Sequence, residues 1–508
     1  MRRGYLAVLE ESRKRKLMLN TLTSILFQLV TIVVGFILPK LFLQYYGSEI
    51  NGLISSITQF LGFIALMELG IGAVVQSVLY KPLVSNDTQM VSKVIKSAQS
   101  FFNKIAIFYF FYMIVLVIVF PSIEGSFDWS YSGTLIVIIA ISSIAQYFFG
   151  LSNQLLLIAD QKNYIVYSLS ICTIILNTLI SMILIIKGFD IRIVKFVSMF
   201  VLLLKPLFLT IYVKNNYEID KSIKYDEEPI KQKWNGIAQH VASFVLNNTD
   251  VVILTIFSNL KDVSIYTIYK LVVSGLQQVV LSVTAGVQSL FGHMLANEEY
   301  DDLRKRFIQL EWVVHTLVTI LFSCTGVLIV PFIQVYTRGI NDANYVQPYF
   351  GLILTFATGM YCLRLPYNIM VLAAGHYKET QLSAVIEMML NILISTLLVY
   401  NYGLIGVSIG TLVAMAYRTI YLSYYLSNNI IYYKFRHFIK HFIVDLVGVI
   451  LVLKISNLII ISHTDYLSWT ISAIKIFILS LVVVGVLNSF FYKNQTSMAI
   501  KILKNKIV

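Results

Sequence analysis

The chain has 508 residues, of which 57% are hydrophobic and 13% are charged, and its formal net charge is +13. Soluble proteins carry about 45–50% apolar and about 25% charged residues, so this composition excludes a soluble enzyme with a single membrane anchor. A basic excess indicates nucleic-acid binding in a soluble protein, but here the charges must first be placed relative to a lipid bilayer.

Fourteen continuous apolar runs follow one another along the chain, and a membrane-spanning helix needs about 20 such residues. Strands are not expected, because barrel strands alternate apolar and polar residues and these runs do not. The predicted fold is therefore an all-α polytopic membrane protein. The fourteen predicted spans cover residues 18–43, 50–79, 101–121, 132–158, 164–186, 191–213, 237–257, 265–292, 307–333, 348–373, 380–400, 404–427, 438–461 and 468–491.

Lysine and arginine are unequally distributed between the segments that connect the spans. If the N-terminus is inside, the inner segments hold 27 of these residues and the outer segments hold 6. Cytoplasmic loops carry the excess of basic residues in membrane proteins. The bias therefore predicts that both termini face the cytoplasm, and it explains the net charge without nucleic acid.

An internal repeat divides the chain. Leu176–Ser181 in span 5 is similar to Leu390–Ser395 in span 11, at an offset of 214 residues, and Val75–Ser77 in span 2 recurs as Val287–Ser289 in span 8, at an offset of 212. Two pseudo-symmetric six-helix lobes with two extra helices are predicted, an architecture typical of transporters. The predicted parts are an N-lobe at 1–213, a cytoplasmic linker at 214–236, a C-lobe at 237–428, and spans 13 and 14 with a cytoplasmic tail at 429–508.

Basic residues within the spans are the candidates for substrate binding, because an ionisable side chain at membrane depth costs at least about 2.5–3.5 kcal/mol. Lys205 in span 6 and Arg418 in span 12 are 213 residues apart and occupy equivalent places in the two repeats. One interpretation is a clamp for an anionic group such as a phosphate; the other is that both side chains snorkel to the inner surface. Lys270 and Arg364 are further candidates, and Arg364 precedes a proline at which span 10 is expected to break.

Acidic residues within the spans are the candidates for ion coupling. Asp250 follows Asn247-Asn248-Thr249, the most polar run in any span, and Glu68 opens a glycine-containing stretch within span 2. A carboxylate beside amide and hydroxyl oxygens suits either a bound Na⁺ or a carried proton. The alternative for Asp250 is a hydrogen-bond network that only holds helices together.

No metal-ligand spacing and no catalytic constellation is recognisable in the sequence, and the predicted outer loops are short. Membrane enzymes such as polysaccharide polymerases or acyltransferases need active-site residues in larger outer loops or in a reaction chamber. We therefore expect a transporter and not an enzyme, with no resident cofactor other than a coupling ion, Na⁺ or H⁺.

Several stretches make the chain resemble the Wzx-type polysaccharide flippases of the multidrug/oligosaccharidyl-lipid/polysaccharide (MOP) exporter superfamily. The resemblance covers spans 1 to 12 and extends over the chain as a whole. The stretches that carry it are Tyr46-Gly47, Asn51-Gly52-Leu53, Glu68-Leu69-Gly70-Ile71-Gly72, Tyr80-Lys81-Pro82-Leu83, Asn247-Asn248-Thr249-Asp250, Arg364-Leu365-Pro366, Ala374-Gly375-His376-Tyr377-Lys378, Asn391 and Gly406-Val407-Ser408-Ile409-Gly410-Thr411.

The resemblance implies a flippase that moves a polyprenyl-pyrophosphate-linked oligosaccharide from the inner to the outer leaflet of a bacterial-type cytoplasmic membrane. The product would feed capsule, O-antigen or exopolysaccharide assembly, with a polysaccharide polymerase and glycosyltransferases as partners. The related lipid II flippases imply Na⁺ ligands at Asp250, Asn391 and Thr411. Their arginine-rich first span is missing here, where Lys40 stands instead, which favours a different glycan. The alternative is a cation-coupled multidrug (MATE-like) antiporter of the same superfamily.

Overall fold

The computed structural model describes residues 2–68, 70–220, 222–224, 228–230, 237–431, 433–459, 465–498 and 501, except for the side chains of 2–14 and 237–240. Nearly all of these residues are helical, and no strand occurs among them. Helices satisfy their own backbone groups, as a lipid environment requires. The chain divides into two compact units, Met1–Val241 and Ala242–Val508. The predicted linker at 214–236 lies partly outside the described residues.

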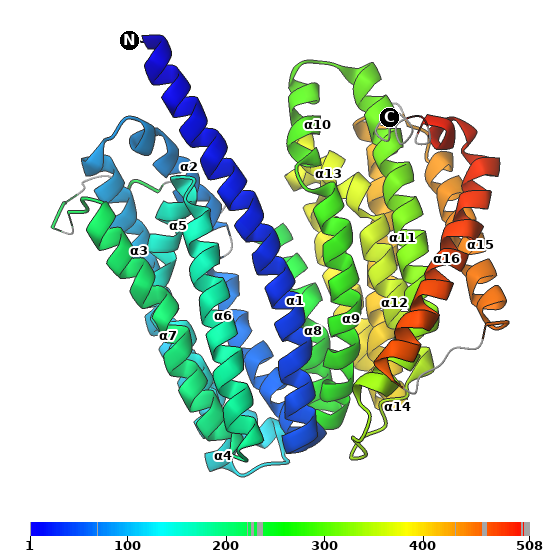
Figure 1. Ribbon diagram of the computed structural model, residues 1–508, viewed down its shortest axis with the longest axis horizontal. Helices are drawn as coiled ribbons and strands as arrows, with labels where there is room; N and C mark the ends of the chain where they lie inside the picture. Colours follow the sequence, from blue (N-terminus) through cyan, green and yellow to red (C-terminus); the bar gives the residue numbers. More distant parts are fainter. Residues whose placement is uncertain are drawn as a thin grey trace. The chain divides into compact units, whose positions relative to one another are not determined.

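Unit 1 contains the helices of the first six predicted spans (Figure 1). The nominal helix α1 holds the first predicted span and the beginning of the second, which Gly47 separates with a φ of 85°; the second span continues through η1 into α2. A π-helical turn, η2, interrupts the fourth span. The elements are α1 (Arg2–Gly62), η1 (Phe63–Glu68), α2 (Ile71–Val84), α3 (Thr88–Glu124), α4 (Trp129–Ala145), η2 (Gln146–Gly150), α5 (Leu151–Ala159), α6 (Asn163–Ile186) and α7 (Ile191–Asn216).

Unit 2 contains the remaining eight predicted spans, and its boundary with unit 1 falls within α8. Spans 11 and 12 form one nominal helix that is broken at Gly403, where φ is 50°. Span 10 is interrupted at Arg364, before Pro366, as the sequence predicts. The elements are α8 (Ile237–Phe257), α9 (Leu260–Thr284), α10 (Val287–Ala296), α11 (Tyr300–Tyr336), α12 (Pro348–Leu363), α13 (Leu365–Ala373), α14 (Tyr377–Asn429), α15 (Arg436–Ser456) and α16 (Tyr466–Phe491).

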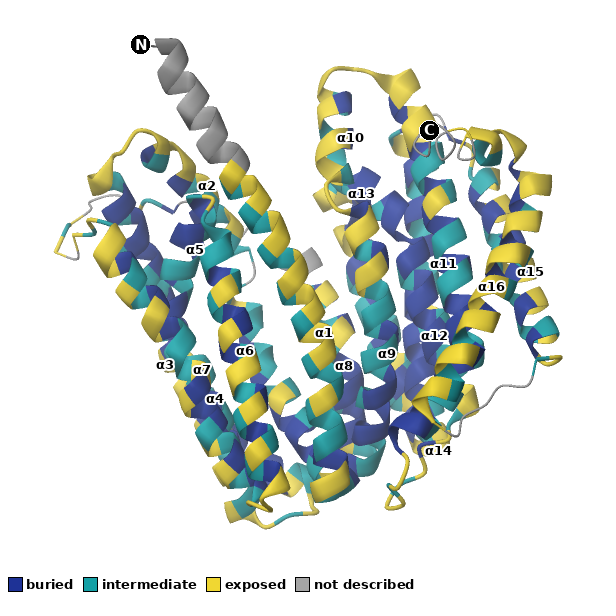
Figure 2. Ribbon diagram, viewed as in Figure 1, coloured by how far each residue is buried: buried dark blue, intermediate teal, exposed yellow. Residues whose placement is uncertain are grey.

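Every predicted span falls on a helix, which confirms the all-α polytopic fold. Nine of the described helical stretches are long and apolar enough to cross a membrane, and two of these nine each join two predicted spans. Large apolar side chains are exposed on the helices, as Phe110, Phe111 and Ile118 are on α3. Figure 2 shows exposed positions in yellow along α3 and its neighbours. Cys172 is exposed on α6, whereas Cys324 and Cys362 are buried.

The two units repeat the same backbone. Helices α3 and α11 are both 37 residues long and begin 212 residues apart. Backbone positions with positive φ recur in the same way before α2 and α10, before α3 and α11, and before α6 and α14. The corresponding pairs are Gly70 and Gly286, Asn86 and Glu298, and Gln161 and Gly375. This agreement confirms the pseudo-symmetric six-helix lobes that the sequence repeat predicts.

The last two helices belong to unit 2 and have no counterpart in unit 1. Both α15 and α16 pack against α11, where Figure 1 shows them in orange and red beside the green helix. Polar contacts also join α16 to α11: Trp312 of α11 donates its Nε1–H to Asn488 at 2.8 Å, and the Cys324 thiol of α11 lies 3.0 Å from the Ser480 hydroxyl. The two extra helices are therefore fastened to the third span of the second lobe.

The two halves of α14 lie against each other more closely than ordinary side chains allow. A Cβ atom built on Gly406 would lie 2.5 Å from the carbonyl group of Leu398, and one on Gly410 would lie 2.1 Å from the hydroxyl oxygen of Ser395. Ser395 also donates to the carbonyl of Val407 at 3.1 Å. Glycines four residues apart allow this close approach of helices in membranes.

We expect Gly410→Ala to lower the thermal unfolding temperature of the purified protein, because overpacking a filled core costs about 1–3 kcal/mol. Gly275→Ala on α9 is the matched control, since a Cβ atom there meets nothing within 4 Å. Equal unfolding temperatures for the two variants in the same detergent would contradict the close packing.

Candidate functional site

Asp250 is the centre of a buried polar cluster in unit 2. Its carboxylate is 2% exposed and accepts hydrogen bonds from Tyr266 at 2.7 Å, from Thr411 at 2.8 Å and from the amide of Asn391 at 3.2 Å. Asn391 and Thr411 lie in the two halves of α14, and the break at Gly403 folds these halves together. Three residues that the resemblance implied as ion ligands therefore meet at one point.

The cluster offers oxygen ligands that suit a hard cation. Asp250 supplies two carboxylate oxygens and Thr411 a hydroxyl, while Oδ1 of Asn391 is buried and has no hydrogen-bond partner among the described residues. Carboxylate, carbonyl and hydroxyl oxygens are the ligands that hard cations prefer. Most buried polar atoms in proteins are hydrogen-bonded, so the unsatisfied oxygen of Asn391 is the observation that favours an ion site over a network that only joins helices. The described residues hold no group of three or more histidines, cysteines or acids that could bind a metal ion.

Arg364 and Arg418 share one carboxylate, that of Glu387. Arg418 donates through Nη1 to Oε2 of Glu387 at 2.9 Å, and Arg364 pairs with Oε1 of the same residue. All three side chains are buried, with Arg418 4% exposed. The snorkelling interpretation of Arg418 is therefore wrong. Within unit 2, the guanidinium of Arg418 turns to Glu387, and the clamp with Lys205 of unit 1 stays a prediction.

The triad still carries one net positive charge, since two guanidinium groups face one carboxylate. The guanidinium of Arg364 also lies 4.6 Å from the centre of the Tyr361 ring. Nε of Arg418 is buried without an acceptor among the described residues. From the sequence, both arginines are site candidates, whereas Glu387 is only one of the acids within the spans, with no role assigned to it. Glu387 lies four residues before Asn391, so the spacing places both side chains on one helix face and could have marked Glu387 as a site residue.

The two lysine candidates have different surroundings. Lys205 is half-buried in α7 next to Pro206, and no hydrogen-bond or ion-pair partner for it occurs among the described residues of unit 1. The ring of Pro206 packs on Gly150 at the end of the π-helical turn. Lys270 is half-buried in α9 and interacts electrostatically with Asp250. Lys270 thus belongs beside the Asp250 cluster rather than to the arginine triad.

Glu68, the fourth ion-coupling candidate, lies in unit 1 at the end of η1, two residues before the left-handed Gly70. Its carboxylate interacts with the hydroxyl of Tyr147 in the π-helical turn. Within its own unit it is therefore part of a pair with a tyrosine, separate from the three ion-coupling candidates that unit 2 brings together.

Asp160 lies between α5 and α6 and binds the ends of several helices of unit 1. It pairs with Lys162 at 2.8 Å and with Lys16 at 3.6 Å, and it accepts a hydrogen bond from Tyr217 at 2.5 Å. Burial by itself would raise the pKa of Asp160, but the bonds from Lys162 and Tyr217 and the nearby charges lower it below its ordinary value. The ionised Asp160 therefore contributes to the free energy of unfolding fully above its unfolded-state pKa. This contribution is lost as the pH falls through its folded-state pKa.

These features together define a helical fold of two related units. No protein-family model matches the chain, and no curated protein matches it either. Among solved structures, the lipid II flippase MurJ in its inward closed conformation is similar over 94% of this chain and 99% of that chain, with a TM-score of 0.68 and 15% identity.

Transporters of the MATE family are also similar. An inward-facing multidrug resistance MATE transporter of the MOP superfamily covers 78% of this chain and 94% of its own, with a TM-score of 0.60 and 13% identity. The eukaryotic MATE transporter AtDTX14 covers 82% of this chain and 96% of its own, with a TM-score of 0.58 and 12% identity. The chain therefore has the fold of MOP-superfamily transporters and is a multi-pass membrane protein.

Proposed function

We propose that this protein is a flippase that moves a polyprenyl-pyrophosphate-linked oligosaccharide from the inner to the outer leaflet by alternating access. The observation that carries the proposal is the extent of the structural likeness. The lipid II flippase is similar over 94% of the 508 residues, about 478. The spans of the two lobes end near residue 428, so a likeness over about 478 residues includes part of the last two helices. The MATE structures cover 78% and 82% of the chain.

The proposed substrate has an anionic pyrophosphate, and the buried basic residues are the groups proposed to bind it. Lys205 supplies an unpaired ammonium group, and the Arg364–Glu387–Arg418 triad supplies one net positive charge. Lys270 is also a proposed substrate-binding residue, and it interacts electrostatically with Asp250 of the proposed ion site. Glu68 with Tyr147 is a further proposed coupling group in the first lobe.

The coupling ion is proposed to bind at Asp250, Asn391 and Thr411, where the unsatisfied Asn391 oxygen supports a cation. Na⁺ and H⁺ are both compatible with a carboxylate in this setting. We further propose a bacterial-type cytoplasmic membrane with both termini inside, and a polysaccharide polymerase and glycosyltransferases as partners in surface polysaccharide assembly.

Reconstituted proteoliposomes test the proposal with a fluorescent polyprenyl-pyrophosphate oligosaccharide whose exposure on the outer leaflet is read by quenching. We expect protein-dependent flipping that the Lys205→Gln/Arg418→Gln variant reduces at least about tenfold, equivalent to about 1.4 kcal/mol. Lys475→Gln, an exposed lysine of α16, is the control and should flip at the wild-type rate. Absence of flipping, together with export of cationic drugs by the same vesicles, would favour the antiporter instead.

A further inference from the structure

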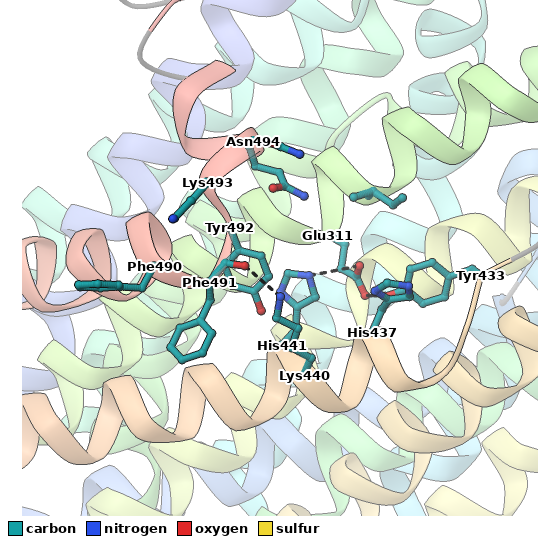
Figure 3. Close-up of a pocket in the computed structure, with 12 residues that line it drawn as sticks. Glu311, Tyr433, His437, Lys440, His441, Phe490, Phe491, Tyr492, Lys493 and Asn494 are labelled. Atoms are coloured by element: carbon teal, nitrogen blue, oxygen red, sulfur yellow. Dashed lines mark hydrogen bonds and ion pairs between the residues drawn. The ribbon is translucent and has the colours of Figure 1, made fainter.

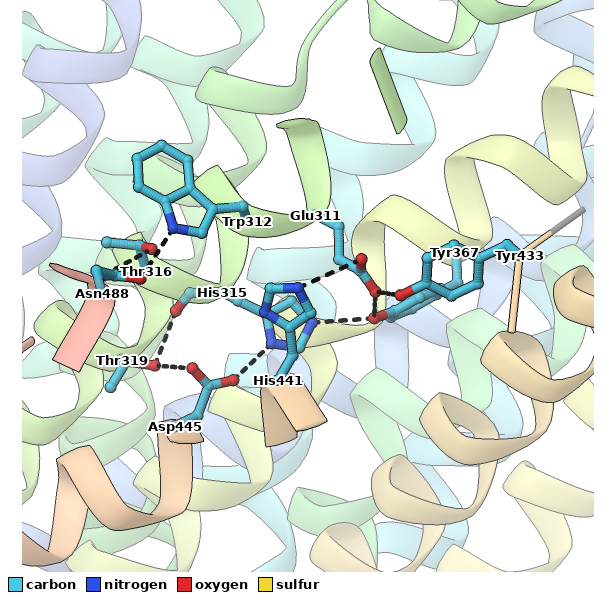
Figure 4. A network of polar contacts seen from close by, with 10 residues as sticks. All are labelled: Glu311, Trp312, His315, Thr316, Thr319, Tyr367, Tyr433, His441, Asp445 and Asn488. Atoms are coloured by element: carbon cyan, nitrogen blue, oxygen red, sulfur yellow. Dashed lines mark hydrogen bonds and ion pairs between the residues drawn. The ribbon is translucent and has the colours of Figure 1, made fainter. Parts of the chain in front are cut away.

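Unit 2 holds a second buried polar cluster, separate from Asp250, at the junction of the lobe with its two extra helices (Figure 4). Glu311 and His315 lie four residues apart on α11, and His441 and Asp445 lie four residues apart on α15, so each pair occupies one helix face. Tyr367 of α13 lies between them. Glu311 is fully buried, at 0% exposed.

A continuous chain of hydrogen bonds runs through this cluster. Tyr367 donates its single hydroxyl hydrogen to Oε1 of Glu311 at 2.5 Å, so its oxygen accepts from Nε2–H of His315 at 3.0 Å. The other ring nitrogen of His315 lies 2.5 Å from Oδ2 of Asp445, a separation that requires one proton between the two atoms. Thr319 donates to the second oxygen of Asp445 at 2.8 Å.

These bonds determine the charges within the cluster. The proton between His315 and Asp445 leaves the two residues neutral together, on whichever of them it lies, because Nε2 of His315 donates to Tyr367. Glu311 is then a deeply buried carboxylate without a matching positive charge in that pair. Burying an uncompensated ionised carboxylate is costly, and uptake of one proton removes the cost.

The two oxygens of Glu311 are unequal. Oε1 accepts from both Tyr367 and Tyr433, whereas Oε2 is buried with no hydrogen-bond donor among the described residues. Oε2 lies 3.6 Å from Nε2 of His441, whose ring stacks on Tyr492 at 4.5 Å. Oε2 therefore has room for a proton and faces a histidine with which that proton can be exchanged.

An open pocket of about 410 Å³ connects this pair to the surface (Figure 3). Glu311, Tyr433 and His441 form its inner wall, and His437, Lys440 and Lys493 lie nearer its mouth. The pocket lies where α16 ends and α15 begins, the side that the basic residues predict to be cytoplasmic. Water in this pocket can deliver protons to His441 and Glu311.

We propose that Glu311 and His441 form a proton-binding site, supplied from this pocket and linked through Tyr367 to the His315–Asp445 pair. The proton comes from hydronium in the pocket and binds to Oε2 of Glu311 or to Nε2 of His441; no other bond changes. The cluster thereby passes from a net charge of −1 to neutral. The site joins α11, α13 and α15, so its occupancy alters how the last two helices are held to the lobe.

Ionisable groups from every neighbouring element face the site, and the full set includes the residues of the site itself. They are Arg304, Glu311 and His315 of α11, Tyr367 of α13, Tyr433 and Lys434 of the segment before α15, Arg436, His437, Lys440, His441 and Asp445 of α15, and Tyr492 and Lys493 after α16. The lysines and arginines among them favour the carboxylate from a distance. Burial of Glu311 favours its protonated form, whereas these basic residues favour its charged form. The proton can therefore leave as well as bind.

Infrared difference spectroscopy of the purified full-length protein, titrated with pH, tests the site. We expect a protonated-carboxyl band that is lost as the pH rises, that shifts on isotope labelling of glutamate side chains, and that is absent in Glu311→Gln. Glu379→Gln, an exposed glutamate of α14, and Asp250→Asn should both retain the band. Persistence of the band in Glu311→Gln, or its absence from the folded wild-type protein at every pH, would overturn the proposal.

Tyr367→Phe provides a second variant that keeps the size of the side chain. The band should remain but change in frequency, because the acid loses one hydrogen-bond partner; an unchanged frequency would contradict the proposed link. If Glu311→Gln does not fold, the isotope shift in the wild-type protein still identifies the acid as glutamate. None of these readouts depends on flipping, so failure of the proposed flippase function and failure of this site are distinguishable.

Discussion

Replacement of Glu387 by glutamine is expected to destabilise the protein by about 3–5 kcal/mol, because removing one partner of a buried ion pair leaves its charges uncompensated. Two guanidinium groups depend on this carboxylate, those of Arg364 and Arg418. All three side chains are buried, so water does not replace the lost partner. Denaturant unfolding of the purified protein in detergent, followed by tryptophan fluorescence, measures the change.

Glu379→Gln is the matched control for this prediction, because it makes the same chemical change at an exposed position of the same helix. We expect it to alter the unfolding free energy by less than about 0.5 kcal/mol. A double variant, Glu387→Gln/Arg418→Gln, should lose less than the sum of the two single variants, since it removes one of the unpaired charges. Additive losses would show that the residues do not act as a unit.

Asp250→Asn is expected to abolish stabilisation of the protein by its coupling cation. The asparagine can still accept bonds from Tyr266 and Thr411, so the fold should remain, but the charge that would attract a cation is lost. A ligand present at a hundred times its dissociation constant stabilises the folded state by about 2.7 kcal/mol. Thermal unfolding in sodium chloride, compared with choline chloride at equal ionic strength and with a pH series, measures the effect.

In the wild-type protein, a rise in unfolding temperature with sodium identifies Na⁺, and a rise with acidification alone identifies H⁺. Asp301→Asn, an exposed aspartate of α11, should keep the wild-type response. If Asp250→Asn responds to cations as the wild-type protein does, the buried cluster is only a packing network. Asn391→Ala should weaken a sodium response, because it removes the one unsatisfied oxygen.

Much of the candidate ion site could be predicted, but its charge pairing could not. Asp250, Asn391 and Thr411 were named from a polar run and a resemblance, and the kink at Gly403 brings them together. The repeat predicts that Arg418 and Lys205 hold equivalent positions, but it does not predict that Arg418 pairs with Glu387, 31 residues earlier in the chain. Pairing depends on rotamers and helix rotation, which the spacing of residues does not specify.

The amino-acid sequence alone determined the fourteen spans and the duplicated lobes, because lipid requires long apolar helices and a repeat is visible in the residues themselves. Even the break before Pro366 follows from the covalent structure of proline. Only the tertiary structure decided which buried charges meet. Glu311, His315, His441 and Asp445 lie up to 134 residues apart in the chain and form one cluster only because α15 packs on α11. Long-range helix packing, not local pattern, places such groups together.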